Sequence, residues 1–203
     1  MPRKVAADLA TMQTEIDATE IALEVDAQAA PFVGATQGFD EGLAALAQRA
    51  REVAQGRLRV QVTRDHLNRQ LDPSCLDFVA DLLHYAKGDR SHPEYKVHLS
   101  VAPSAFVRKD FDDQVGEVKR WLILDHPTAA PYKAQWAQVV ARAEALVVMH
   151  AELDKAVLAL RADIEAAATR LTAQRDALHR RLGDHAEAIG LDRTWADGFF
   201  LRG

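Results

Sequence analysis

The feature that most constrains the fold is a long stripe of mostly apolar residues in the C-terminal third of the chain. The stripe consists of Trp136, Val139, Ala143, Leu146, His150, Leu153, Val157, Leu160, Ile164, Ala167, Leu171, Gln174, Leu178, His185 and Ile189, with Leu182 filling one slip. Spacings of three and four place these residues on one face of a helix, as in a coiled coil. An unbroken helix over residues 131–189 would contain about 59 residues and be about 90 Å long. Such a helix needs other helices packed along it, a kink near Gly183, or a second copy of the chain.

A shorter stripe begins at Val5 and predicts a first helix that ends near Pro31. Six acidic residues follow Lys4 on this segment without any basic one: Asp8, Glu15, Asp17, Glu20, Glu24 and Asp26. We interpret them as a solvated acidic face, and the alternative is a docking face for a basic partner.

Two segments of the chain alternate polar and apolar residues in the way that a half-buried strand does. These are residues 57–63 and 95–101, which could pair as a small ribbon. Residues 57–63 also lie within a helical stripe that runs from Leu43 to Leu71, so we prefer a continuous helix there. For residues 95–101 we expect an extended or irregular insertion.

Helix-capping residues, proline and glycine predict where the central helices begin and end. Asp72 can cap a separate helix, Pro73 suits its first turn, and Gly88 can end it. Ser104 or Asp110 can begin the next helix, which residues 125–131 would end. Within these last residues, Thr128 is the expected cap of the long C-terminal helix.

The amino-acid composition is typical of a globular, helical protein. Of the 203 residues, 48% are hydrophobic and 27% are charged, and alanine, the best helix former, is abundant. We therefore predict an all-α fold, an elongated antiparallel bundle of about four to five helices with a long coiled-coil-like C-terminal helix. It is expected to be a single domain, residues 1–203, with an irregular insertion at 88–104 and an apolar tail at 191–203.

Charge and cysteine content exclude several classes of protein. A net charge of -5 makes binding to nucleic acid unfavourable, because such binding needs clustered basic residues. Cys75 is the only cysteine, which rules out a disulfide within the chain and favours a reducing compartment. We find neither a secretory signal nor an apolar run long enough for a membrane span. The expected location is cytoplasmic.

His150 is the most unusual residue of the long stripe, because the pattern asks there for an aliphatic side chain. A buried polar residue in such a seam can select register or oligomeric state. We therefore predict a neutral His150 that points into the helix packing, with its pKa lowered by burial unless a carboxylate is its partner. The alternative is a metal ligand, as in helical bundles with inward-facing histidines.

Other candidate ligands cluster in the insertion, where His84, His92 and His98 could converge on zinc. The chain has no Glu-x-x-His motif, the signature of carboxylate-bridged di-metal bundles, so we expect a polar loop, no native metal site and no cofactor. We expect Cys75 to be a small buried hydrophobe rather than a nucleophile.

Two features near the C-terminus are candidates for interaction. Basic residues surround His179 and are expected to be exposed or to bind an acidic partner: Arg175, Arg180 and Arg181. The tail carries four large apolar residues that either fold back onto the bundle or bind another chain: Trp195, Phe199, Phe200 and Leu201.

No catalytic signature is found in the sequence, so an enzymatic role is not favoured. The leading prediction is a non-enzymatic scaffold or interaction protein that binds a protein partner or a second copy of itself. The alternative is a helical-bundle protein that binds a metal or a small ligand through the insertion histidines or His150.

Overall fold

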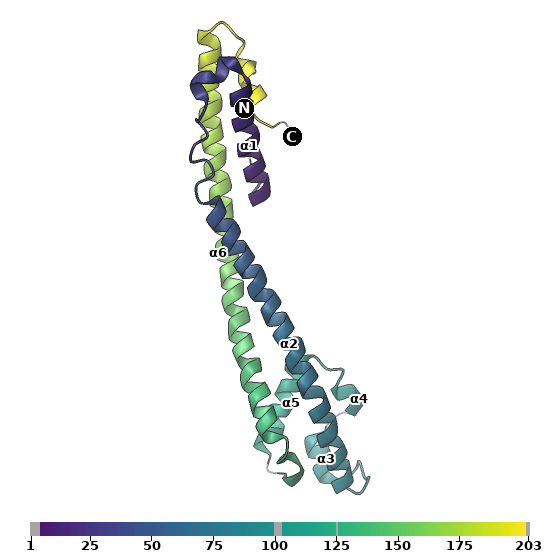
Figure 1. Ribbon diagram of the computed structural model, residues 1–203. Helices are drawn as coiled ribbons and strands as arrows, with labels where there is room; N and C mark the ends of the chain where they lie inside the picture. Colours follow the sequence, from purple (N-terminus) through teal and green to yellow (C-terminus); the bar gives the residue numbers. More distant parts are fainter. Residues whose placement is uncertain (1–4, 100–102, 125, 202–203) are drawn as a thin grey trace. The chain divides into compact units, whose positions relative to one another are not determined.

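The computed structural model of the protein describes residues 5–99, 103–124 and 126–201 and is all-α (Figure 1). Helices account for 80% of these residues and no strand occurs among them, which confirms the predicted fold class. Within this described part, no helix combines the length and the apolar character that crossing a membrane would require.

Two helices are much longer than the others. α6 (Lys133–Ala188) has 56 residues and passes Gly183 without a break, and α2 (Leu43–Tyr85) has 43 residues. The remaining elements are α1 (Leu9–Val25), η1 (Ala27–Phe32), α3 (Pro93–His98), α4 (Pro103–Phe106), α5 (Phe111–Ile123), η2 (Pro127–Ala129) and η3 (Arg193–Phe199). The chain forms two compact units, each described by itself below: unit 1 (Met1–Ala54 with Lys155–Gly203) and unit 2 (Gln55–Asp154). That the chain is one domain stays a prediction.

In unit 1, α1 lies beside the C-terminal part of α6 (Figure 1). The Asp8 side chain caps α1 by accepting a hydrogen bond from the Thr11 main-chain N–H at 2.8 Å. The apolar stripe of α1 is buried as predicted, and Met12 and Ile16 share a core with Leu171 of α6.

The acidic face predicted for α1 is interrupted by a buried ion pair. Glu15 and Arg175 are each only 1% exposed, and Arg175 Nη2 lies 2.6 Å from Glu15 Oε2. The Arg175 guanidinium also lies 5.1 Å from the ring centre of Phe200. The predictions of a solvated Glu15 and an exposed Arg175 are therefore wrong. Each charge can leave water because the other neutralises it within the same unit.

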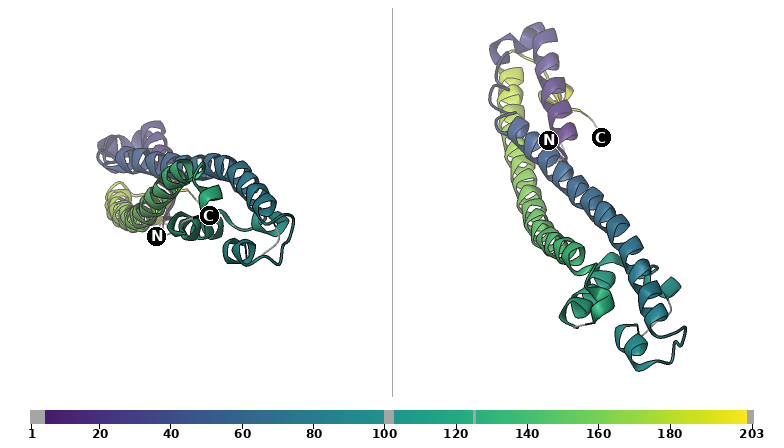
Figure 2. Two further views of the ribbon diagram at one scale, coloured as in Figure 1. Left: turned by 90° about the horizontal axis from the view of Figure 1, so that it is seen from below. Right: turned by 60° about the horizontal axis from the view of Figure 1, so that its bottom comes forward.

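In unit 2, α3, α4 and α5 gather around the C-terminal part of α2 (Figure 2). They share one core with α6, built around Phe78, Trp121 and Trp136. Within this unit α2 and α6 run antiparallel, since Arg57 bonds Asp154 and residues nearer the C-terminus of α2 meet the start of α6. Trp136 Nε1, for instance, donates to Ser74 Oγ at 3.0 Å.

The helix predicted to begin at Asp72 does not exist as a separate element. α2 continues through the exposed Pro73, although proline cannot donate a main-chain hydrogen bond. One stripe of fully buried side chains crosses this position, from Leu71 to Cys75 and Phe78, and its burial outweighs the lost bond. Residues 57–63 are helical, as preferred from the sequence.

The insertion at 88–104 is irregular only in part. Residues 93–98 form the short helix α3, so the extended interpretation is wrong for Tyr95–His98, and residues 100–102 lie outside the described part. Pro93 starts this helix, where a missing N–H costs nothing, and the His92 side chain caps it. Lys87 and Gly88, which follow the end of α2 at Tyr85, both adopt positive φ. The Gly88 N–H donates to Leu83 O at 2.9 Å, so α2 ends near the predicted glycine.

Candidate functional site

Unit 2 contains a groove of about 390 Å³ between α2, α5 and α6, called here the α2–α5–α6 groove. Its floor is apolar and almost fully buried, formed by Val60 of α2, Phe111 of α5 and Ala143 of α6. Leu146 and Val147 extend this apolar lining along α6. A concave surface with an apolar floor is the usual form of a ligand or peptide site.

Charged side chains of both signs form the rim of the groove. Arg64 Nη2 bonds Asp112 Oδ2 at 2.8 Å, and Arg57 Nη2 bonds Asp154 Oδ1 at 2.8 Å. Asp112 lies in the first turn of α5, where a negative charge interacts favourably with the helix dipole. These pairs are about half exposed, so they contribute little to stability but fix the positions of charges along the groove.

His150 lies on this rim, and the prediction of a buried His150 is wrong. Its side chain is 60% exposed, and Nδ1 lies 3.2 Å from Oδ2 of Asp154 one turn along α6. The close contact between the two long helices falls instead at Leu153, where a Cβ on Gly56 would lie 2.6 Å from Leu153 Cδ2. α2 therefore covers the Leu153 position, and His150 is left at the edge of the groove.

Along this part of unit 2, the face of α6 that lines the groove stays open to solvent. No residue of α6 between positions 144 and 154 is buried, whereas Trp136, Val139 and Ala143 nearer its start are. Val147 is 64% exposed although it lines the groove. A helical stripe left uncovered in this way is typical of a surface on which another helix packs.

The three histidines of the insertion lie in different surroundings. His84 is exposed, His92 caps α3 through Nδ1, and His98 is buried. Among the residues that the structure describes, no three His, Cys, Asp or Glu side chains come together in a way that could hold a metal ion.

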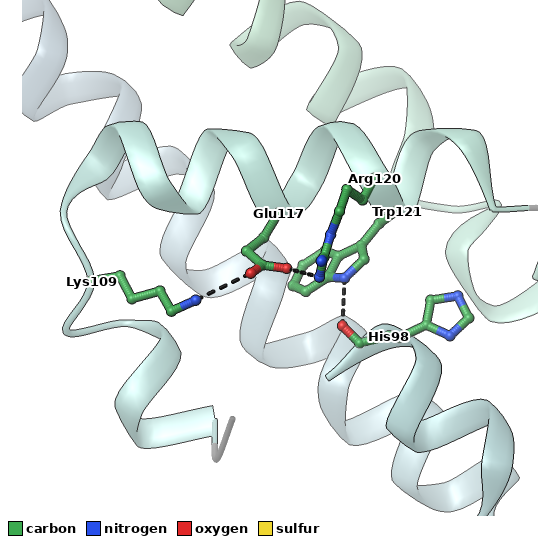
Figure 3. A network of polar contacts seen from close by, with 5 residues as sticks. All are labelled: His98, Lys109, Glu117, Arg120 and Trp121. Carbon is green, nitrogen blue, oxygen red and sulfur yellow. Dashed lines mark hydrogen bonds and ion pairs between the residues drawn. The ribbon is translucent and has the colours of Figure 1, made fainter. Parts of the chain in front are cut away.

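His98 instead packs against His126, a residue that the sequence analysis did not single out. Their ring centres are 5.1 Å apart at an interplanar angle of 72°, and the two residues are only 2% and 5% exposed. The main-chain oxygen of His98 accepts a hydrogen bond from Trp121 Nε1 at 2.7 Å, while its ring points away from Trp121 (Figure 3). Figure 3 also shows Glu117 between Lys109 and Arg120, so the segment just before α5 is tied to the middle of the helix.

The apolar tail folds back onto unit 1. Phe199 and Phe200 are buried in its core, and Trp195 Nε1 donates to Asp26 Oδ2 at 3.0 Å. This is the first of the two alternatives considered for these residues, and only Leu201 of the four is exposed. Binding of another chain by the tail stays a prediction.

The surroundings of Cys75 and His179 indicate structural roles. Cys75 is fully buried, as predicted, and burial raises the pKa of its thiol far above the ordinary range. His179 Nε2 lies 2.7 Å from Asp197 Oδ1, and this hydrogen bond lowers the pKa of Asp197. Arg180 and Arg181 of the predicted basic patch are exposed, unlike Arg175.

Comparisons with protein-family models, with curated proteins and with solved structures found no match for this chain. The site is therefore argued from its geometry alone.

Proposed function

We propose that the protein is a non-enzymatic interaction module that binds one amphipathic helix of a partner protein in the α2–α5–α6 groove. The observation that carries this proposal is the uncovered part of α6 beside a buried apolar floor. Groove-lining residues of α6 run from Ala143 to Asp154, which corresponds to about 16 Å of helix at 1.5 Å per residue. A partner helix of about three turns fits that length, with apolar anchors spaced by three and four.

Charge on the rim supports an amphipathic partner rather than a purely apolar one. Arg64 and His150 can meet acidic side chains on the flank of a bound helix, and Asp112 and Asp154 can meet basic ones. Because the rim carries both signs, it selects the register of the partner more than it raises the affinity.

The experiment is a selection of short helical peptides from a displayed library against the whole protein. Selected sequences are then made synthetically and titrated by fluorescence anisotropy. We expect peptides with apolar residues at i, i+3 or i+4, and i+7, whose binding is lost in Val147→Glu. Val148→Glu is the matched control, since Val148 is also 64% exposed but does not line the groove.

Several results would count against the proposal. Selected peptides that are extended or proline-rich would contradict the helical partner, and equal loss of binding in both valine variants would place the site elsewhere. If the protein forms a dimer that Val147→Glu dissociates, the occupant is a second copy of the chain. An empty selection with a monomeric protein would also refute a peptide groove.

A small amphipathic molecule is the second candidate, and the volume of the groove favours it as a specific alternative. About 390 Å³ lies within the range of small-ligand sites, roughly 300 to 1,000 Å³. A ligand screen by NMR separates the two candidates, because a small molecule would shift the groove signals of wild type but not of Val147→Glu in the absence of any peptide.

A further inference from the structure

Two buried imidazoles meet in unit 2 with complementary hydrogen-bonding partners. His98 Nδ1 lies 2.8 Å from Glu94 O, and a carbonyl oxygen only accepts, so this Nδ1 carries the proton. His126 Nδ1 accepts from the Thr128 main-chain N–H at 3.3 Å, which leaves the proton on Nε2. The Nδ1 atom of each ring therefore has a hydrogen-bond partner when the ring is neutral. Neither Nε2 atom, both buried, has a hydrogen-bond partner within the described residues.

We propose that His98 and His126 form a proton-operated latch, which holds α3 against α5 and η2 while both rings are neutral and releases α3 when the pair takes up a proton. His98 is the last residue of α3, and its main-chain oxygen is bonded to Trp121 of α5 (Figure 3). A helix of six residues is not stable by itself, so α3 depends on these contacts.

The surroundings of the pair disfavour a positive charge. Glu94 of α3 is the nearest carboxylate, but it is about half exposed and its Oε2 lies 3.9 Å from His126 Nε2. The ring centre of Tyr85, the last residue of α2, lies 4.8 Å from that of His126. The ring of His92, the cap of α3, lies on Tyr85 with the two ring centres 6.2 Å apart. The Phe78 ring of α2 lies 5.7 Å from the His98 ring, and η2 presents the hydroxyl of Thr128 to His126. Asp125, which precedes His126 in the sequence, lies outside the described residues.

Protonation of the pair would place a cation in this buried cluster, next to a second imidazole. Burial, and next the neighbouring His98, lower the pKa of His126, and Glu94 opposes them only in part. In the unfolded or released segment the ordinary pKa of about 6.5 applies. Well above pH 6.5 neither state is protonated and the latch is fully stable. Below it the released state binds the proton first, so the latch weakens as the pH falls.

The size of the effect follows from the same linkage. Protonation of His126 alone is sufficient to open the latch, because it places a charge among buried groups. If only the released state binds this proton, with the ordinary pKa of about 6.5, the equilibrium constant for release of α3 is expected to rise about fivefold from pH 6.5 to pH 5.5.

Native-state hydrogen exchange of the whole protein tests the latch through the α3 amides. The Lys96 N–H donates to His92 O and the Leu99 N–H to Tyr95 O, and both report release of α3. After correction for intrinsic exchange, we expect their opening constants to rise about fivefold between pH 6.5 and pH 5.5 in wild type, while α2 amides change much less. NMR titration of the ring protons of wild type should place the protonation of His126 below the ordinary value of about pH 6.5.

Matched variants separate the latch from general acid sensitivity. The double variant His98→Asn and His126→Asn keeps a polar group near each Nδ1 position but cannot titrate, and its α3 exchange should not depend on pH. His66→Asn removes an exposed histidine of α2 in the same unit and should behave as wild type. Protonation of His126 at or above pH 6.5, or α3 protection that does not change with pH, would overturn the proposal. So would a pH dependence that survives in the double variant, and the wild-type titration decides even if that variant fails to fold.

Discussion

Neutralising one partner of the buried Glu15–Arg175 pair should destabilise unit 1 more than any change to an exposed pair. Glu15→Gln keeps the size of the side chain but removes the negative charge that lies 2.6 Å from the buried Arg175 guanidinium. Two charges about 4 Å apart at an effective dielectric constant of about 20 attract by about 4 kcal/mol. That agrees with the loss of about 3–5 kcal/mol expected when one member of a buried ion pair is removed. The contact is 2.6 Å long and both side chains are 1% exposed, so little of the loss is recovered from water.

The assay must report on unit 1, because the two units need not unfold together. Trp195 is the one tryptophan of unit 1, so 5-fluorotryptophan labelling gives this unit its own ¹⁹F signal during urea unfolding. The control is Asp163→Asn, which breaks the pair with Arg49 in the same unit. Those side chains are 46% and 51% exposed for Arg49 and Asp163, and the expected cost is at most about 1 kcal/mol.

A second variant tests the reasoning from the opposite side. Replacing both members, Glu15→Leu with Arg175→Met, removes two buried charges at similar volume and should be neutral or stabilising by about 1–4 kcal/mol. If Glu15→Gln costs no more than Asp163→Asn, or if the double replacement is as damaging as Glu15→Gln, the argument from desolvation is refuted.

Three further predictions concern unit 2. Gly116→Ala in the middle of α5 should stabilise the unit by about 0.5–1 kcal/mol in urea unfolding, because a Cβ there meets no atom within 4 Å and alanine is the better helix former. Ser74→Ala should cost about 1–3 kcal/mol by the same measurement, because it leaves the buried Trp136 N–H without its acceptor, and a cost below that of an exposed serine would refute this. Cys75 should not react with a thiol reagent such as Ellman's reagent until urea unfolds unit 2, and rapid reaction of the native protein would contradict its burial.

Periodicity was sufficient to predict the helices, because burial follows the same spacing of three and four that the sequence displays. It predicted a long C-terminal helix, although it left a kink at Gly183 open, and it predicted the buried stripe of α1 through Met12 and Ile16. It could not predict that α2 continues across Pro73. The local sequence there favours a helix end, but the core formed with the other helices of unit 2 stabilises a continuous helix. A sequence pattern measures what a helix could bury, and the neighbouring helices decide what it does bury.

The same limit explains the errors at the candidate site. His150 occupies a seam position in the sequence, but the neighbouring helices of unit 2 leave that part of α6 uncovered, so the position lies at the edge of the groove. Arg175 was taken for part of an exposed basic patch because its counter-ion, Glu15, is 160 residues away in the sequence. His126 gave only a weak local signal, the pairing with Pro127 and Thr128 at a helix cap, and its contact with His98 depends on tertiary packing.

The division of the chain also has a consequence for the order in which the protein folds during synthesis. Unit 2 is one continuous segment, so all of its residues have been made once Asp154 has left the ribosome. Unit 1 is interrupted by it, and its contacts join distant parts of the chain, such as Val5 with Thr172 and Asp26 with Trp195. Until the C-terminal part of α6 is translated, the core of α1 contains only neighbouring residues such as Leu43 and Leu46, and it lacks Leu160 and Leu171. Long-range contacts of this kind form slowly, so part of the apolar face of α1 stays exposed on the nascent chain and is a candidate site for a chaperone.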